Sequence, residues 1–261
     1  MDPSIETTNT SSARVELGHS KVWCQVQCPI PSSSPLLPQS TILDAEQGTL
    51  ICQVKYANWH SQKIAMDMLQ SEAGVSTTLE STQPSKTTSA FVPQPSSGRI
   101  HSTMMRQEAD LSTKISSALR PILPLHHFAK CAIVIQLVIL QDDGSLLSAC
   151  LTAASLALAK ARVELYDLVT CCAVAVHTIP SQPSSLATDF VLLADPTSHE
   201  EATCDCLIVL AVLPNSKEVS LWNQRGSLPS TAVTNSAMEL CRDGCRTLHR
   251  FMRQHLIETN N

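Results

Sequence analysis

An apolar run rich in β-branched side chains, CAIVIQLVIL at residues 131–140, constrains the fold more than any other part of the sequence. Near-continuous runs of this kind are typical of a strand that is buried on both faces of a sheet. The turn QDDGS follows, and residues 146–162 then combine Ala and Leu with small residues on one face. Because small residues let a helix approach a sheet closely, the sequence predicts a central strand covered by a core helix.

The segments before this strand show two different periods. Residues 13–30 and 50–56 alternate apolar and polar side chains, which predicts half-buried strands, and we expect the two to be antiparallel neighbours. From Asp110 the apolar residues recur at helical spacing, and Pro121 and Pro124 predict where this helix ends.

The remaining pattern completes an α+β arrangement. A long amphipathic helix is predicted from Ser230 to about Ile257, with an Arg-rich face in solvent. Strands are predicted at 168–177, 189–195 and 206–214, with a weaker one at 217–223. Strands, helix, strands and helix in this order are typical of an α+β fold.

The composition changes between these parts of the chain. Residues 62–105 are dominated by Ser, Thr, Gln and Pro, with few large apolar side chains, and predict a disordered low-complexity insertion. The domain would therefore consist of N-terminal strands at 12–61, the insertion at 62–105 and the remainder at 106–257.

Charge and cysteine usage exclude several classes of protein. Lys and Arg total 18 against 23 Asp and Glu, a net charge of −5 that disfavours non-specific binding to nucleic acid, so any contact with nucleic acid must be local. No apolar run is long enough to cross a bilayer and no signal-peptide pattern is present, which predicts a cytosolic or nuclear protein. The eleven cysteines include no CxxC pair, so we expect reduced, buried thiols and neither metal nor cofactor.

Residues 110–170 resemble the RNase PH-like domain of RNA exosome ring subunits in the order, spacing and turn residues of their elements. SARVELGHSKVWCQV, LLADPTSHEE and the closing LCRDGCRTLHRFMRQHL agree with this resemblance, although only MDPSIETTNTS precedes Ser12, where the family has an opening segment and a first strand. The resemblance implies a βαβα fold like that of ribosomal protein S5 domain 2. It also implies a hexameric ring with other RNase PH-like subunits, S1/KH cap subunits and RNA in the central channel. The location implied is the nucleus, the nucleolus and the cytoplasm.

Active members of this family carry an arginine just after a D-G-G-T turn, because guanidinium groups bind and orient phosphate. Here the turn is Asp143-Gly144-Ser145-Leu146 and the next residue is Leu147. Aligned without gaps, the family's helix arginines fall at Thr113 and Ser117. The resemblance therefore predicts no catalytic residues and a structural subunit that guides RNA to a separate nuclease, in rRNA maturation and mRNA turnover.

Other residues leave alternatives open. Asp195, Glu200 and Glu201 stand where active members carry carboxylates, which would support an active phosphate-dependent 3′-to-5′ exoribonuclease; they also suit a turn and a helix cap. His60 and Lys63 are weak candidates for contact with RNA in the channel, or part of a solvated loop. A free-standing adaptor, suggested by the insertion and the acidic charge, is a third hypothesis.

Overall fold

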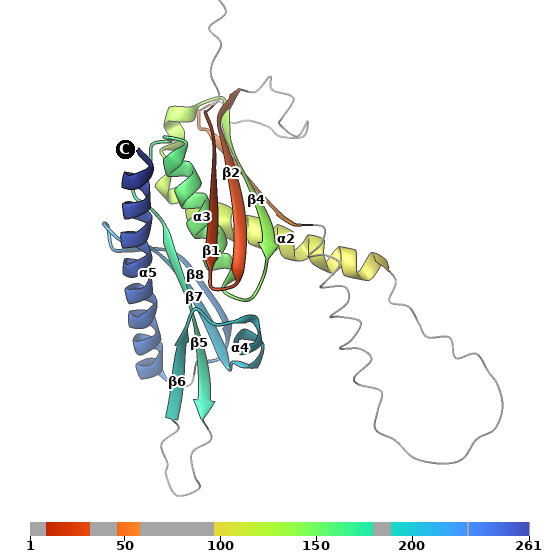
Figure 1. Ribbon diagram of the computed structural model, residues 1–261, viewed down its shortest axis with the longest axis vertical. Coiled ribbons are helices and arrows are strands. Elements are labelled where there is room, and N and C mark those ends of the chain that lie inside the picture. Colours follow the sequence, from red (N-terminus) through yellow and green to blue (C-terminus); the bar gives the residue numbers. More distant parts are fainter. Residues whose placement is uncertain (1–8, 32–45, 58–96, 180–188, 229, 261) are drawn as a thin grey trace, which may run out of the picture.

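Two four-stranded sheets with helices between and beside them make up the computed structural model, which describes residues 9–31, 46–57, 97–179, 189–228 and 230–260 (Figure 1). The elements in chain order are β1 (Asn9–Leu17), β2 (Ser20–Pro31), β3 (Thr49–Tyr56), α2 (Ser97–Leu119), the short 3-10 helices η2 (Arg120–Ile122) and η3 (Leu125–Phe128), β4 (Cys131–Gln141), α3 (Leu146–Lys160), β5 (Thr170–Ile179), β6 (Asp189–Ala194), α4 (Ser198–Thr203), β7 (Cys206–Leu213), β8 (Glu218–Gly226) and α5 (Thr231–Asn260).

The first sheet has the order β1-β2-β4-β3, with the predicted central strand β4 between two neighbours. Residues 13–30 form two strands, not one, because Gly18 adopts a positive φ of 55° and turns the chain from β1 into β2. The prediction that residues 13–30 and 50–56 are antiparallel neighbours is wrong. β2 is antiparallel to β4, whereas β3 is parallel to it, since α2 lies between β3 and β4 in the chain and returns it to the same end.

The outer edge of β3 is covered by side chains of α2. The backbone N–H of Val54 donates to Ser112 Oγ at 3.1 Å, and the N–H of Tyr56 donates to Glu108 Oε1 at 2.9 Å. An edge strand otherwise presents such donors to water or to another chain. The helix therefore takes the place of a further strand at these two positions.

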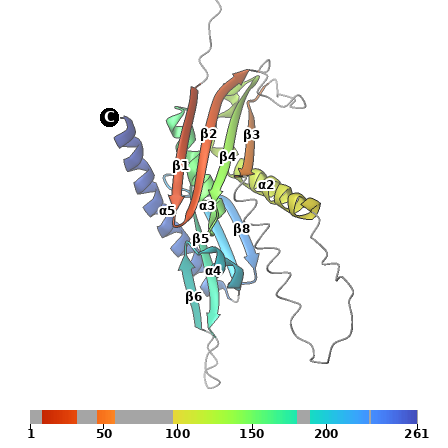
Figure 2. The same cartoon turned by 45° about the vertical axis from the view of Figure 1, so that its right-hand side comes forward.

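The second sheet has the order β6-β5-β7-β8 and is antiparallel throughout, and its two central strands, β5 and β7, are covered on both faces. Residues of β5 and β7 on one face pack with α3 and the first sheet, and those on the other face pack against α5. All eight residues of β7 are buried. Figures 1 and 2 show α5 along one side of the molecule and α2 extending from the opposite side.

The later elements confirm the sequence predictions, and the start of the helix before β4 corrects one. β4 to β8 correspond to the strands predicted at 131–140, 168–177, 189–195, 206–214 and 217–223. α3 and α5 correspond to the helices predicted at 146–162 and from Ser230. α2, however, begins at Ser97 and not near Asp110, so the predicted insertion at 62–105 overlaps its first turns. The rest of that insertion, 62–96, lies outside the described residues, as do residues 1–8 of the segment before Ser12.

The cysteines are free thiols, and eight of the eleven are buried. Burial raises the pKa of Cys28, Cys52 and Cys245 to about 12, so these thiols stay protonated at neutral pH. The predicted burial is thus found for these eight cysteines, whereas Cys52, Cys131 and Cys204 are partly exposed. No helix in the described part of the chain is long and apolar enough to span a membrane.

Candidate functional site

The turn between β4 and α3 is fixed from two sides. Ser20 Oγ accepts from the Asp143 N–H at 2.8 Å and donates to the Gly144 carbonyl at 2.7 Å. On the other side, the N–H of Ser198 donates to the Asp143 carbonyl at 2.7 Å. Gly144 has φ +100°, and its α-carbon lies so close to the backbone of residues 196–198 that no side chain fits there. The start of α3 is therefore held in place by β2 and by the turn before α4.

A carboxylate of the chain itself occupies the N-terminal end of α3. Glu201 Oε1 accepts from the backbone N–H of Ser145, the residue that precedes the helix, at 2.6 Å. Helix N-termini favour negative charge because their first N–H groups lack intrahelical partners. An incoming phosphate would meet Glu201 at this position.

A pocket of about 300 Å³ opens beside this end of α3, and we call it the α2–α3 pocket. Its charged side chains are two cations and three carboxylates. Its lining residues are Tyr56, Gln107, Asp110, Leu111, Lys114, Asp142, Ser145, Leu146, Leu147, Glu201, Leu207, Val209, Asn223 and Arg225. One of the cations, Arg225, already donates from Nη2 to the Glu201 carbonyl at 2.5 Å. The pocket therefore has no excess of positive charge.

The structure brings together only part of the predicted phosphate site. Leu147 lines the α2–α3 pocket and is 7% exposed, whereas Thr113 and Ser117 line a separate hollow between α2 and β3. Both hydroxyls donate within α2, Thr113 Oγ1 to the Ala109 carbonyl and Ser117 Oγ to the Thr113 carbonyl, each at 2.9 Å. Thr113 and Ser117 therefore do not share a pocket with Leu147.

The residues of α2 that face the pocket are Gln107, Asp110, Leu111 and Lys114. Their spacing of three or four residues is that of one helical face, a signal that the sequence contained. Arg225 and Asn223 come from β8, and no sequence pattern linked that strand to α2.

Of the three acidic candidates, only Glu201 lines the α2–α3 pocket. Glu200 completes a capping box with Thr197 at the start of α4, accepting from the Thr197 N–H at 2.8 Å, as the capping interpretation predicted. Asp195, at the end of β6, has φ +55° and does not line the α2–α3 pocket. Among the described residues, no three His, Cys, Asp or Glu side chains are placed to hold a metal ion together. His60 and Lys63 lie outside the described residues.

The carboxyl group of Glu201 should make the free energy of unfolding depend on pH. Burial raises the pKa of its carboxyl above the ordinary value, so the folded state favours the protonated form more than the unfolded state does. This contribution to stability is present below the unfolded pKa and is lost as the pH rises through the raised pKa. We expect the free energy of unfolding of the wild type, relative to Glu201→Gln, to increase as the pH falls from neutral toward 4.5, measured by urea unfolding.

Glu200→Gln serves as a control of opposite sign. Hydrogen bonds from the backbone N–H and the hydroxyl of Thr197 lower the pKa of the Glu200 carboxyl. Its ionised form therefore stabilises the fold above the unfolded pKa, and this contribution is lost as the pH falls through the lowered pKa. Relative to Glu200→Gln, the wild type should lose stability below pH 4.5. The same pH trend in both comparisons would contradict the assignment of the two carboxylates.

Comparison with known sequences matches most of this chain to a protein family. Residues 3–164 match the family described as 3′ exoribonuclease family, domain 1 (RNase PH). The human protein named Exosome complex component MTR3 is 31% identical over 151 residues, which are 58% of this chain and 53% of that protein. The match thus spans about half the length of the relative. The resemblance of VELYDLV and LLADPT to the mRNA transport regulator three subunit, also called exosome component six, agrees with it.

Solved structures align with nearly the whole of this chain. Rice (Oryza sativa) Rrp46 aligns with a TM-score of 0.62 and 17% identity over 94% of this chain and 87% of its own. The Archaeoglobus fulgidus exosome with RNA bound to the active site contains a chain that aligns with a TM-score of 0.57 and 16% identity, over 95% of this chain and 85% of its own. The predicted RNase PH-like α+β fold is confirmed.

Proposed function

Because this chain belongs to the RNase PH family of 3′ exoribonucleases, we propose that it is a non-catalytic subunit of an RNA exosome ring. It pairs with other RNase PH-like subunits in a hexamer below S1/KH cap subunits. There it helps form the channel that leads RNA to a separate nuclease for 3′-to-5′ processing and degradation, including rRNA maturation and mRNA turnover. Its proposed locations are the nucleus with the nucleolus, and the cytoplasm.

The proposal that this subunit is non-catalytic rests on the charge of the α2–α3 pocket. Phosphorolysis brings an inorganic phosphate and a phosphodiester close together, and only cations or N–H dipoles offset the repulsion between them. In this pocket three carboxylates outnumber two cations, and Glu201 already accepts the N–H at the start of α3. The first two residues of α3, Leu146 and Leu147, are apolar and offer no side-chain ligand for phosphate.

Co-purification tests the assembly. We expect the tagged full chain, recovered from cell extract, to bring down RNase PH-like and S1/KH exosome subunits in stoichiometric amounts. The reason is that a ring subunit shares large interfaces with both neighbours. Size-exclusion chromatography of the recovered material should give the ring and not a monomer. Recovery as a lone monomer would contradict ring membership and favour a free-standing adaptor.

A phosphate-dependent exoribonuclease remains the second candidate, and Lys114 and Arg225 favour it. Both line the α2–α3 pocket, where an ammonium and a guanidinium could contact an anionic substrate. An assay for released nucleoside diphosphates separates the two candidates, and its expected outcome is given in the Discussion.

A further inference from the structure

Four arginines form a stripe along the outer face of α5. Arg242, Arg246, Arg250 and Arg253 are all exposed, and they follow one another at intervals of four, four and three residues. Such intervals place side chains on one helical face, about 6 Å apart for each four residues of rise. The only acidic residue between 241 and 255 is Asp243. A chain with a net charge of −5 thus concentrates positive charge on one part of its surface.

The N-terminal end of this stripe borders a small pocket that also contains a lysine. Lys217, Arg242 and Arg246 line a space of about 170 Å³, together with Val212, Pro214 and Cys245. Lys217 comes from the turn between β7 and β8, so two separate elements direct their cations to one place. We call the pocket and the four arginines together the α5 basic surface.

The turn that carries Lys217 is held in place by a buried carboxylate. Asp167 Oδ2 accepts from the backbone N–H of Asn215 at 2.9 Å, and Asp167 Oδ1 accepts from the side-chain amide of Asn215 at 2.8 Å. The N–H of Lys217 donates to the Leu213 carbonyl at 2.7 Å, and Lys217 has φ +61°. Lys217 therefore lies on a turn whose conformation is held by these hydrogen bonds.

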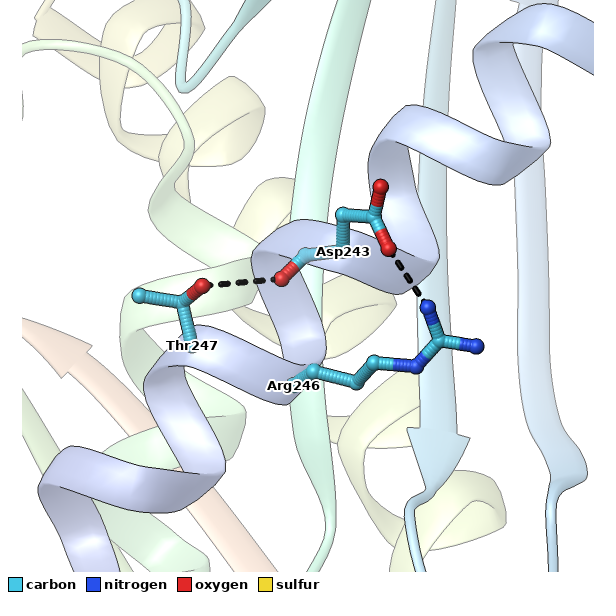
Figure 3. Close-up of polar contacts among 3 residues, drawn as sticks. All are labelled: Asp243, Arg246 and Thr247. Atoms are coloured by element: carbon cyan, nitrogen blue, oxygen red, sulfur yellow. Dashed lines mark hydrogen bonds and ion pairs between the residues drawn. The ribbon is translucent and has the colours of Figure 1, made fainter.

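Asp243 restrains one of the arginines. Its Oδ1 accepts from Arg246 Nη1 at 2.5 Å, and Thr247 Oγ1 donates to the Asp243 carbonyl at 3.0 Å (Figure 3). Both charged side chains are 67% exposed, and exposed pairs of this kind contribute little to stability. The ion pair is therefore weak enough to be exchanged for a contact between Arg246 and an outside anion.

We propose that the α5 basic surface binds the phosphodiester backbone of single-stranded RNA, with one phosphate in the pocket of Lys217, Arg242 and Arg246. Guanidinium groups bind phosphate through two parallel N–H bonds, and a row of them suits a ligand whose anions repeat at short intervals. This surface shares no residue with the α2–α3 pocket, and it lies on the opposite face of the second sheet from α3. The choice of RNA among polyanions rests on the proposed function.

The test is fluorescence anisotropy of a labelled oligouridylate at low salt, with the full chain and a triple variant, Lys217→Gln, Arg242→Gln and Arg246→Gln. Each lost phosphate contact on a single strand lowers the slope of log K against log salt by about 0.7, so the triple variant, which loses the one phosphate held in the pocket, should lose about 0.7 in slope and about tenfold in affinity. Asp243→Asn should bind about twofold more tightly, because Arg246 loses its competing partner. The control is Arg106→Gln, an exposed arginine on α2, which should leave affinity and slope unchanged.

Three outcomes would overturn the inference. The first is a triple variant with unchanged affinity and slope, and the second is an equal loss in Arg106→Gln, which would reflect net charge alone. The third is a triple variant that keeps its RNA affinity but no longer recovers exosome subunits from extract, which would assign the surface to an acidic protein partner. Failure of the wild type to recover those subunits would instead count against ring membership and leave this inference standing, provided that RNA binding depends on the three residues.

Discussion

The purified chain, incubated with single-stranded RNA, inorganic phosphate and Mg²⁺, is expected to release no nucleoside diphosphate above a no-protein background. The α2–α3 pocket has three carboxylates for its two cations, and the N–H at the start of α3 already donates to Glu201. Losing one electrostatic contact to the reacting groups typically costs on the order of 10² to 10³ in rate, and here several are missing. Chromatography of the nucleotides released over time measures the outcome.

Leu147→Arg alone should not restore activity. The new guanidinium would enter a position that is 7% exposed, next to Glu201, and would pair with that carboxylate before it met phosphate. Effects of residues that act together in one site are strongly non-additive, so one restored group is not enough. Phosphate-dependent release by the unmutated chain that disappears in Lys114→Ala, but persists in the exposed control Lys55→Ala, would establish the enzyme candidate instead.

Gly144→Ala should cost about 3 to 5 kcal/mol in the free energy of unfolding. The added Cβ would lie 2.4 Å from the Pro196 carbonyl oxygen and 2.7 Å from the Ser198 nitrogen. Both are backbone atoms of the turn before α4, so relief requires the two turns to separate. Urea unfolding followed by far-UV circular dichroism measures the loss.

Gly18→Ala is the matched control, because Gly18 also has a positive φ, of 55°, but space around it. Its added Cβ would meet nothing nearer than Asp195 Oδ2 at 3.9 Å. Only the left-handed backbone conformation is then penalised, by about 1 to 2 kcal/mol. Equal losses in the two variants would show that backbone conformation, and not the contact between the two turns, determines the requirement for glycine at position 144.

The sequence predicted those elements whose pattern is local. β4 and α3 were evident because an apolar run and an Ala-rich helix carry their own periodicity, and α5 because its apolar stripe is long. The pairing of β3 was missed, because alternation marks a strand without naming its neighbour or its direction. The start of α2 was missed because SGRIHSTMM offers little helical periodicity, and its helical state depends on the residues that follow it in the chain.

The candidate site was harder to predict than the fold. Leu147 follows a recognisable turn, so its place at the start of α3 could be predicted from neighbouring residues. Lys114 and Arg225 meet in the pocket only because α2 and β8 approach each other in the folded chain. A gapless alignment carries no information on which face of a helix points toward a pocket, so it could not predict that Thr113 and Ser117 line a different hollow from Leu147.

Side chains of α2 can cover the edge of β3 because the spacing of the two acceptors along the helix nearly equals the spacing of the two donors along the strand. Val54 and Tyr56 are two residues apart in an extended strand, about 6.6 Å, and Ser112 and Glu108 are four residues apart in a helix, about 6 Å. Two residues along a strand therefore span nearly the same length as four residues along a helix. Two side chains on a helix can thus accept from two amides on a strand. Sliding α2 by a single residue would rotate both acceptors away from their donors at once. The docking of this helix is therefore set at discrete positions, and insertions or deletions in the sequence between Tyr56 and Ser97 need not change it.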